Sequence, residues 1–287
     1  MIERFEAGER ISEQDWQSYV QSLKANITQS TVQQASDAIV EAVRKRVPKG
    51  KFGVLLSGGV DSSLIALLAK RFSKEMVCYT VGLRGSPDVK AATIMAKSLG
   101  CEWKLREFEV DGVLQFLQKS AKMIGWDDPV QIGIGAVVIA GVELAKEDGI
   151  TVIFGGLGTE EVYAGYQRHV IAKDVNAECW KGLLNLAKVD LARDCSLGAG
   201  LQVSAKVPFL DEKVIVTAMG LSGEEKIVDG ERKVVFRKIA EALGVPKEIA
   251  WRKKQAAQYG SGFDKALEKL AKKANLSKGD FVKSLCG

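Results

Sequence analysis

Residues 52–63 read Phe-Gly-Val-Leu-Leu-Ser-Gly-Gly-Val-Asp-Ser-Ser. The apolar run 52–56 is typical of a short buried strand, and a helical pattern follows over residues 62–72. Glycines in such a turn let the backbone approach an anion, and the start of the helix adds free N–H donors. Asp61 would fit an anion cradle only beside a cation, so we expect Mg²⁺ to lie between this carboxylate and bound phosphates.

The same alternation of apolar runs and helical stretches continues on both sides of this turn. We expect further strands over 76–81, 103–110 and 151–154, and helices over 87–99, 112–124 and 130–146. This order predicts an α/β fold in which a parallel sheet carries helices on both faces. From about Cys179 the pattern is mostly helical, so we expect a helical C-terminal region.

Domain organisation follows from the absence of any linker rich in Pro, Gly or Ser. Residues 1–31 are polar with apolar residues at helical spacing, and Ser12 begins the first helix there. We therefore expect an N-terminal helical extension over 1–31 and a single α/β domain over 32–287, whose helical C-terminal part begins near residue 179.

Composition excludes several functions. The chain has 287 residues, 41 Lys and Arg, 36 Asp and Glu, and thus a net charge of only +5, which does not indicate a nucleic-acid partner. His169 is the single histidine, so multi-histidine zinc or iron sites are excluded. Five scattered cysteines without a C-x-x-C pair predict reduced thiols in a cytoplasmic protein. The apolar stretch 130–145 is too short to cross a membrane, and we expect a buried helix.

The turn after residue 56 belongs to none of the common nucleotide loops, because the chain has neither G-x-x-x-x-G-K-[ST] nor G-x-G-x-x-G. Ser57-Gly58-Gly59-Val60-Asp61-Ser62 instead resembles the SGGxDS signature of the PP-loop ATP pyrophosphatases. That resemblance implies an adenine-nucleotide alpha-hydrolase-like fold. It also implies cleavage between the α- and β-phosphates of ATP, which gives an adenylated intermediate and pyrophosphate.

Four later segments narrow the resemblance to the synthetase domain of asparagine synthetases. Residues 81–92 are similar to the family's segment after the second strand, and residues 154–166 to its LSGEGSDEVFGGY block. Residues 207–211 match the PFLD block, and residues 250–254 resemble the AWRxK block. The segments occur in family order, and together the resemblance covers roughly residues 32–262.

The resemblance implies roles for individual residues. Asp61 and Glu160 would bind Mg²⁺, and Lys254 would neutralise charge that develops on the α-phosphate. Without the resemblance, Lys254 would be read as part of a solvated basic run over 252–254. The nucleotide would be held by the residues at the strand ends and in the two glycine loops: Leu56, Ser57, Gly58, Gly59, Val60, Asp61, Ser62, Ser63, Val81, Gly155 and Gly156.

Departures from the family concern the acceptor half of the site. Leu157 stands where the family has a glutamate associated with the aspartyl-adenylate, and Glu160 stands where it has an aspartate. Residues 204–206 replace a Glu-x-Arg pattern. ATP binding is therefore better supported than amidation of aspartate. Residue 2 is Ile2 rather than the cysteine of the family's glutaminase domain, so we expect nitrogen to come from ammonia or a separate subunit.

We expect a Mg²⁺-ATP-dependent adenylating ligase that activates aspartate or an analogue, releases pyrophosphate and forms an amide. Two alternatives stay open: a PP-loop sulfur transferase or RNA-modifying enzyme, and an ATP-binding subunit without catalysis. Assembly as a homo-oligomer also stays open. His169 is expected at the surface or at a helix cap, with a place near the site as the alternative. Tyr163 and Tyr166 are expected either in the acceptor pocket or in helix packing. Cys101 is expected as a packed thiol, with a sulfur-carrying role as the alternative.

Overall fold

A five-stranded parallel sheet forms the centre of the protein, of which the computed structural model describes residues 1–286. The strands are arranged in the order β3-β2-β1-β4-β5, and every neighbouring pair is parallel. Their bounds are β1 Phe52–Leu55, β2 Met76–Leu83, β3 Glu102–Phe108, β4 Val152–Phe154 and β5 Ser204–Lys206. The order reverses between β1 and β4, and ligands of open parallel sheets bind beyond the carboxyl ends of the strands at such a reversal.

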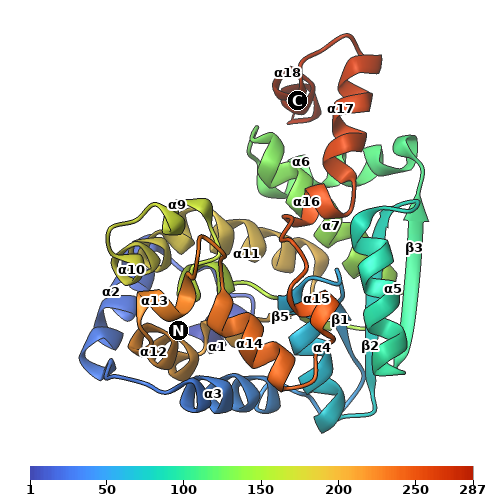
Figure 1. The fold of residues 1–287 in the computed structure, drawn as a ribbon. Coiled ribbons are helices and arrows are strands. Elements are labelled where there is room, and N and C mark those ends of the chain that lie inside the picture. The colour runs from blue at the N-terminus through green and yellow to red at the C-terminus, as the bar shows by residue number, and fades with distance from the viewer. Residues whose placement is uncertain (287) are drawn as a thin grey trace.

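Helices cover both faces of the sheet, as predicted (Figure 1). Side chains of β2 alternate between two apolar clusters. Met76 and Cys78 pack with α4 (Val60–Phe72) and α5 (Pro87–Leu99). Val77 and Tyr79 pack on the other face with α6, α7 and α17, which span Leu114–Ile124, Pro129–Lys146 and Phe263–Lys273. The α/β fold class expected from the sequence is thus confirmed.

The N-terminal residues fold onto the same core as the sheet. Helix α1 spans Ile2–Glu6 and α2 spans Glu13–Leu23, with Ser12 capping α2 by accepting a hydrogen bond from the Asp15 amide at 3.0 Å. Trp16 is fully buried and donates to the Leu183 carbonyl at 2.6 Å. Helix α3 (Val32–Arg44) then begins at a capping box. The domain boundary at residue 31 stays a prediction.

The C-terminal half is mostly helical, but it contains one strand that the sequence did not reveal. Strand β5 has only three residues, none of them part of an apolar run, because it lies at an edge of the sheet and is only half-buried. The helices of this half are α8 Thr159–Val162, α9 Gln167–Val170, α10 Val175–Asn185, α11 Asp190–Leu201, α12 Glu212–Gly220, α13 Gly223–Lys226, α14 Val234–Ala242, α15 Lys247–Ala250, α16 Ala257–Gly260, α17 and α18 Lys278–Cys286.

Helix α7 is the one helix among residues 1–286 that could span a membrane by length and composition, with 18 residues and a mean hydropathy of 1.4. Its length therefore does not exclude a span, contrary to the expectation for 130–145. Yet 56% of it is buried inside the protein, where it packs between the sheet and α6. A core helix has the same properties, so they are weak evidence for a membrane span.

The two edges of the sheet are protected differently. Strand β3 carries alternating charged residues, of which Lys104 pairs with Asp148 at 2.5 Å. Strand β5 is contacted by α1: the Ser204 hydroxyl donates to the Glu6 carbonyl at 2.5 Å, and the Glu6 carboxylate accepts from the Val207 amide at 3.1 Å. Both charge and cover are recognised means of blocking edge-to-edge pairing.

Candidate functional site

The predicted phosphate loop joins β1 to α4 at the carboxyl edge of the sheet. Gly58 has φ +70°, and a Cβ there would lie 2.5 Å from the carbonyl carbon of Ala91 in α5. Only glycine fits this backbone and this close approach. Gly59 is the N-cap residue of α4 and has no side chain, so no capping side chain occupies the first amides of the helix, which face the loop. This is a suitable place for an anion.

Serine hydroxyls fix the shape of the loop. The Ser57 amide donates to the Ser62 hydroxyl at 3.2 Å, and the two hydroxyls lie 3.1 Å apart. The Gly59 amide donates to the Ser57 hydroxyl at 3.3 Å. Ser63 differs, because its hydroxyl is buried without a hydrogen-bond partner. Ser57 and Ser62 are thus positioned to reach a ligand at the loop, whereas the predicted contact of Ser63 has no such support.

The second glycine loop, which follows β4, lies directly against the first. A Cβ on Gly156 would be 2.9 Å from the Cβ of Asp61, and a Cβ on Gly165 would be 2.6 Å from the carboxylate carbon of Glu160. Gly155 has open space in front of it. The two loops that the sequence predicted to bind nucleotide therefore meet at the point where the strand order reverses. Leu56 directly follows β1, Val81 lies near the end of β2, and both side chains are buried.

Four charged side chains form a chain between these loops. Lys233 contacts the Asp61 carboxylate and lies 3.2 Å from Oε1 of Glu160, and Lys254 lies 2.6 Å from Oε2 of Glu160. Burial alone would raise the pKa of Glu160, but the ammonium groups of Lys233 and Lys254 outweigh it and lower that pKa to about 2. The same carboxylates hold the pKa of Lys233 above its ordinary value despite burial. We refer to Asp61, Lys233, Glu160 and Lys254 as the charged chain.

The sequence did not indicate Lys233 as a residue of this site. It precedes α14, its side chain is 2% exposed, and its backbone is left-handed with φ +58°. A lysine in that backbone conformation is unusual, and such residues gather at functional sites. No local pattern marks Lys233, because its position depends on the packing of α14 against α3 and α4.

A late segment crosses the phosphate loop. Arg252 donates to the Ser57 carbonyl at 3.2 Å and to the Asp88 carboxylate at 2.7 Å. Burial raises the pKa of Asp88 to about 6, although Arg252 acts in the opposite direction. Arg252 thus links α5, the loop and the segment that carries Lys254. The neighbouring Lys253 is exposed.

The carboxylates of the charged chain could hold a divalent cation. Among residues 1–286 no group of three or more His, Cys, Asp or Glu side chains is arranged around one point. Asp61 and Glu160, however, come from different loops and direct oxygens at a single ammonium group, that of Lys233. A Mg²⁺ ion takes one or two carboxylates and completes its shell with phosphate oxygens and water. The two residues present therefore fit this ion together with a nucleotide.

Comparison with known proteins agrees with these motifs. The sequence model of the family described as asparagine synthase matches residues 34–181 and 169–281. The chain belongs to the asparagine synthase family. The resemblance predicted from the five motifs is thereby confirmed.

Curated relatives match over the synthetase part. A Methanocaldococcus jannaschii protein assigned as a glutamine-hydrolyzing asparagine synthetase is 34% identical over 283 residues, which cover 84% of this chain and 51% of the relative. Asparagine synthetase B of Escherichia coli is 31% identical over 270 residues, 87% of this chain and 48% of the relative. The chain thus spans about half the length of these relatives. A solved NMN synthetase of Francisella tularensis has a TM-score of 0.48 and 14% identity, and covers 89% of this chain and 93% of its own.

Two tyrosines of the segment after the second glycine loop, Tyr163 and Tyr166, and the single histidine take different roles. Tyr163 is fully buried and its ring packs on Phe236 at 4.9 Å, so helix packing is its role here. Tyr166 lies closer to the site, with Lys254 5.0 Å from its ring and its hydroxyl donating to Glu161 at 2.9 Å. Burial is the main cause that raises the pKa of Glu161 to about 7.

His169 caps a helix, which is one of its expected positions, and does not lie at the surface. Its Nδ1 accepts a hydrogen bond from the Tyr166 amide at 3.0 Å, and the residue is fully buried. This bond requires an unprotonated Nδ1, and burial lowers the pKa of the ring to about 4. His169 therefore shapes the turn that carries Tyr166.

Asp211 of the PFLD block belongs to a buried group of ion pairs. Its carboxylate accepts from Arg46 at 2.7 Å and from the Lys213 amide at 3.2 Å, which caps α12. Arg46 also pairs with Glu6 at 2.5 Å. This buried ion group joins α1, the end of α3 and α12 behind the second loop.

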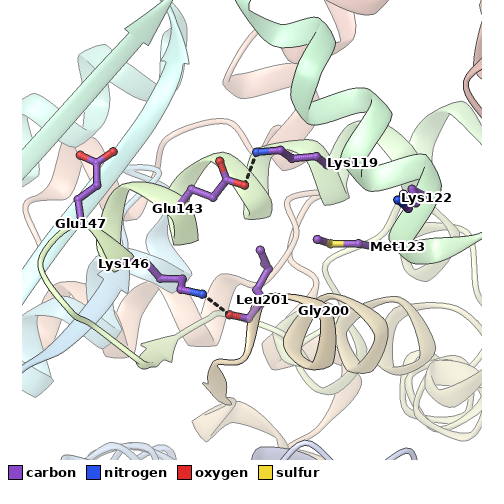
Figure 2. A pocket seen from close by; sticks show the side chains of 8 residues that line it. All are labelled: Lys119, Lys122, Met123, Glu143, Lys146, Glu147, Gly200 and Leu201. Carbon is purple, nitrogen blue, oxygen red and sulfur yellow. Dashed lines mark hydrogen bonds and ion pairs between the residues drawn. The ribbon is translucent and has the colours of Figure 1, made fainter.

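A cavity of about 750 Å³ lies away from the motifs (Figure 2). It is lined by residues of α6, the end of α7 and the end of α11, near the amino ends of the strands. Two of its lysines have partners: Lys119 pairs with Glu143 at 2.6 Å, and Lys146 donates to the Leu201 carbonyl at 2.9 Å. Figure 2 shows both interactions spanning the hollow. Nothing in this lining corresponds to the predicted chemistry.

Proposed function

We propose that this chain is a Mg²⁺-ATP-dependent ligase, which activates a small carboxylate as an acyl-adenylate and converts it to an amide. The observation that carries the proposal is the charged chain, which lies against a glycine-rich loop at the reversal point of the sheet. Membership of the asparagine synthase family supports ATP as the activating substrate.

In this proposal one set of residues binds the phosphates of ATP and another holds the cation. The backbone of residues 57–62 binds the β- and γ-phosphates, assisted by the first amides of α4. Asp61 and Glu160 hold Mg²⁺, which neutralises phosphate charge when bound. The ammonium of Lys233, which these carboxylates bind in the present structure, then faces the phosphates.

The reaction begins when a carboxylate oxygen of the acceptor attacks the α-phosphorus of ATP. The bond between the α- and β-phosphates breaks, and pyrophosphate leaves. Lys254 stabilises the negative charge that develops on the α-phosphate oxygens, because its side chain is 27% exposed and can reach the ligand. Ammonia or an amine then attacks the acyl carbon and displaces AMP.

The acceptor is aspartate or an analogue of it. Leu157, which is partly buried against the core, supplies no proton acceptor at its position in the second loop. Ammonia in its free form suits such a site, because it needs no proton acceptor before it attacks the acyl carbon. Either ammonia or an amine from a separate subunit provides the nitrogen. We also propose a cytoplasmic location, supported by five free cysteines.

The test is exchange of labelled pyrophosphate into ATP in the presence of Mg²⁺ and a panel of carboxylates that includes aspartate. We expect exchange that depends on one carboxylate, and AMP formation when ammonia is added. Replacing Lys254 by Met should reduce the rate by about 10²–10³-fold, a typical effect of losing one preorganised charge stabiliser. Lys253→Met, one position earlier on the same exposed segment, is the matched control and should keep the wild-type rate.

Two outcomes would overturn the proposal. ATP binding in calorimetry without AMP formation from any acceptor would indicate a binding subunit. AMP formation that depends on RNA or a sulfur donor would indicate a modifying enzyme of the same loop type.

A further inference from the structure

Two of the five cysteines meet on one face of the sheet. Cys78 lies in β2 and Cys101 lies in the turn between α5 and β3, and their Sγ atoms are 3.6 Å apart. Both are free thiols. Sequence spacing did not reveal the pair, because 22 residues separate the two cysteines and only the parallel pairing of β2 with β3 joins them.

The strand register explains the contact. Cys78 is opposite Trp103, and Cys101 precedes β3 on the same face as Trp103. A disulfide needs the sulfurs about 2.05 Å apart, so they must approach by about 1.5 Å. Cys101 lies outside the hydrogen-bonded ladder and follows Gly100, whose φ is +56°. A side-chain rotation with a small shift of this turn can bring the sulfurs together.

The two thiols differ in access and acidity. Cys78 is fully buried, whereas Cys101 is partly exposed. The hydrogen bond between the two thiols is the main cause that lowers the pKa of Cys101 to about 7, and the nearby Lys70 ammonium acts in the same direction. The pKa of Cys78 is raised by that contact and by burial. Cys101 therefore has the character of an attacking thiol and Cys78 that of a resolving thiol.

We propose that Cys78 and Cys101 are a redox modification site, which forms a reversible disulfide by exchange with a small-molecule disulfide such as oxidised glutathione. The Cys101 thiolate attacks one sulfur of that disulfide, forms a mixed disulfide and releases one glutathione thiolate. Cys78 then loses its proton and attacks Sγ of Cys101, which releases the second thiolate. Two protein thiols are oxidised, and one glutathione disulfide is reduced to two thiols.

The place of the pair separates it from the nucleotide chemistry. Cys78 precedes Val81 by three residues, which is about 10 Å along a strand. Between them, the Trp103 indole donates to the Thr80 hydroxyl at 2.9 Å, and that hydroxyl donates to the Leu56 carbonyl at 2.7 Å. The sulfurs thus do not reach the phosphate loop, and delivery of sulfur to a nucleotide-activated substrate is not their role. The bond instead ties the end of α5 to β2.

The experiment uses the full chain with Cys286→Ser, because Cys286 is exposed and would link two copies. The native protein is incubated with oxidised glutathione, alkylated and mapped by mass spectrometry without reduction. We expect a linked peptide pair that contains Cys78 and Cys101, with the loss of two hydrogen atoms, reversed by dithiothreitol. The melting temperature of the oxidised form should rise by about 5 °C or more, because the bond closes a loop of roughly 24 residues.

Three variants make the result specific. Cys101→Ser should form no disulfide and bind no glutathione at residue 78. Cys78→Ala, which keeps a small apolar side chain in the core, should stop at the mixed disulfide on Cys101. Cys179→Ser is the matched control, since Cys179 is also buried, and it should still form the bond. A wild-type protein in which Cys101 keeps glutathione, or in which both thiols remain alkylatable, would overturn the proposal.

Discussion

The burial of His169 leads to a specific prediction about the stability of the protein in mild acid. Its Nδ1 accepts from the Tyr166 amide, and protonation would both break this bond and place a charge in a buried position. Burial lowers the pKa of the folded-state ring to about 4 from an ordinary value of 6.5, and the Arg168 guanidinium adds to the effect. The folded protein therefore holds the ring neutral over a range in which the unfolded chain binds a proton.

The direction and the size of the change in stability with pH follow from the difference between the folded and unfolded pKa values of His169. Between pH 6.5 and pH 4 the unfolded chain binds more protons, so stability falls as the pH decreases. The contribution is fully present above pH 6.5 and is lost as the pH falls through about 4. At pH 5 the unfolded ring is almost fully protonated and the folded ring is not, which costs about 2 kcal/mol relative to pH 7.

Urea unfolding at pH 7 and pH 5 measures this loss. The control is His169→Gln. A glutamine at this third helical position can also accept a hydrogen bond from the amide of the N-cap residue Tyr166, and it does not titrate. We expect the wild-type protein to lose about 2 kcal/mol more than the variant between the two pH values. Equal losses in the two proteins would show that His169 does not remain neutral when folded, and the reasoning would fail.

Three further substitutions test other parts of the structure. Gly58→Ala should lower the free energy of unfolding in urea by about 3 kcal/mol or more and abolish ATP binding, because its Cβ would press on Ala91. Its control is Gly85→Ala, which is also at positive φ but in open space and should lower the free energy of unfolding by only about 1 kcal/mol. Arg46→Met should destabilise the protein by about 3 kcal/mol, since it removes the buried guanidinium that Glu6 and Asp211 share and leaves them only the more exposed Lys206 and Lys45. An unchanged urea midpoint would contradict that ion group. Lys233→Met should strengthen the binding of Mg²⁺ in calorimetry without nucleotide, because the Lys233 ammonium occupies the place between Asp61 and Glu160 that the cation would take. The same variant should weaken ATP binding. A fall in both affinities would contradict the inference that ammonium and cation use the same place.

The fold was largely predictable because the sequence patterns that indicate its strands and helices each lie within a short segment. Apolar runs of four to eight residues closed by glycine indicated β1, β2 and β4, and 3.6-residue periodicity indicated the helices between them. The loop predicted to bind phosphate was equally visible, since Gly58 and Asp61 both lie within the six residues 57–62. The structure confirms that this loop and the one after β4 lie side by side.

What escaped prediction depends on contacts between distant segments. Lys233 sits in a polar stretch without any pattern, and only tertiary packing brings it to Asp61, 172 positions away. Strand β5 is too short and too polar to show periodicity. Cys78 and Cys101 come together through strand register, which no sequence spacing encodes. The assignment of Lys254 depended on a resemblance, because a basic run alone is typical of a solvated surface.

The different protection of the two sheet edges has a practical consequence for handling the protein. The edge at β3 relies on charge, so high salt or a pH that neutralises its side chains weakens the barrier to pairing between copies. The edge at β5 relies on α1 and on Glu6, which salt does not remove but a protease can. Clipping within the first ten residues would therefore expose an unpaired strand to aggregation even in dilute buffer, and an affinity tag is better placed at the other end of the chain.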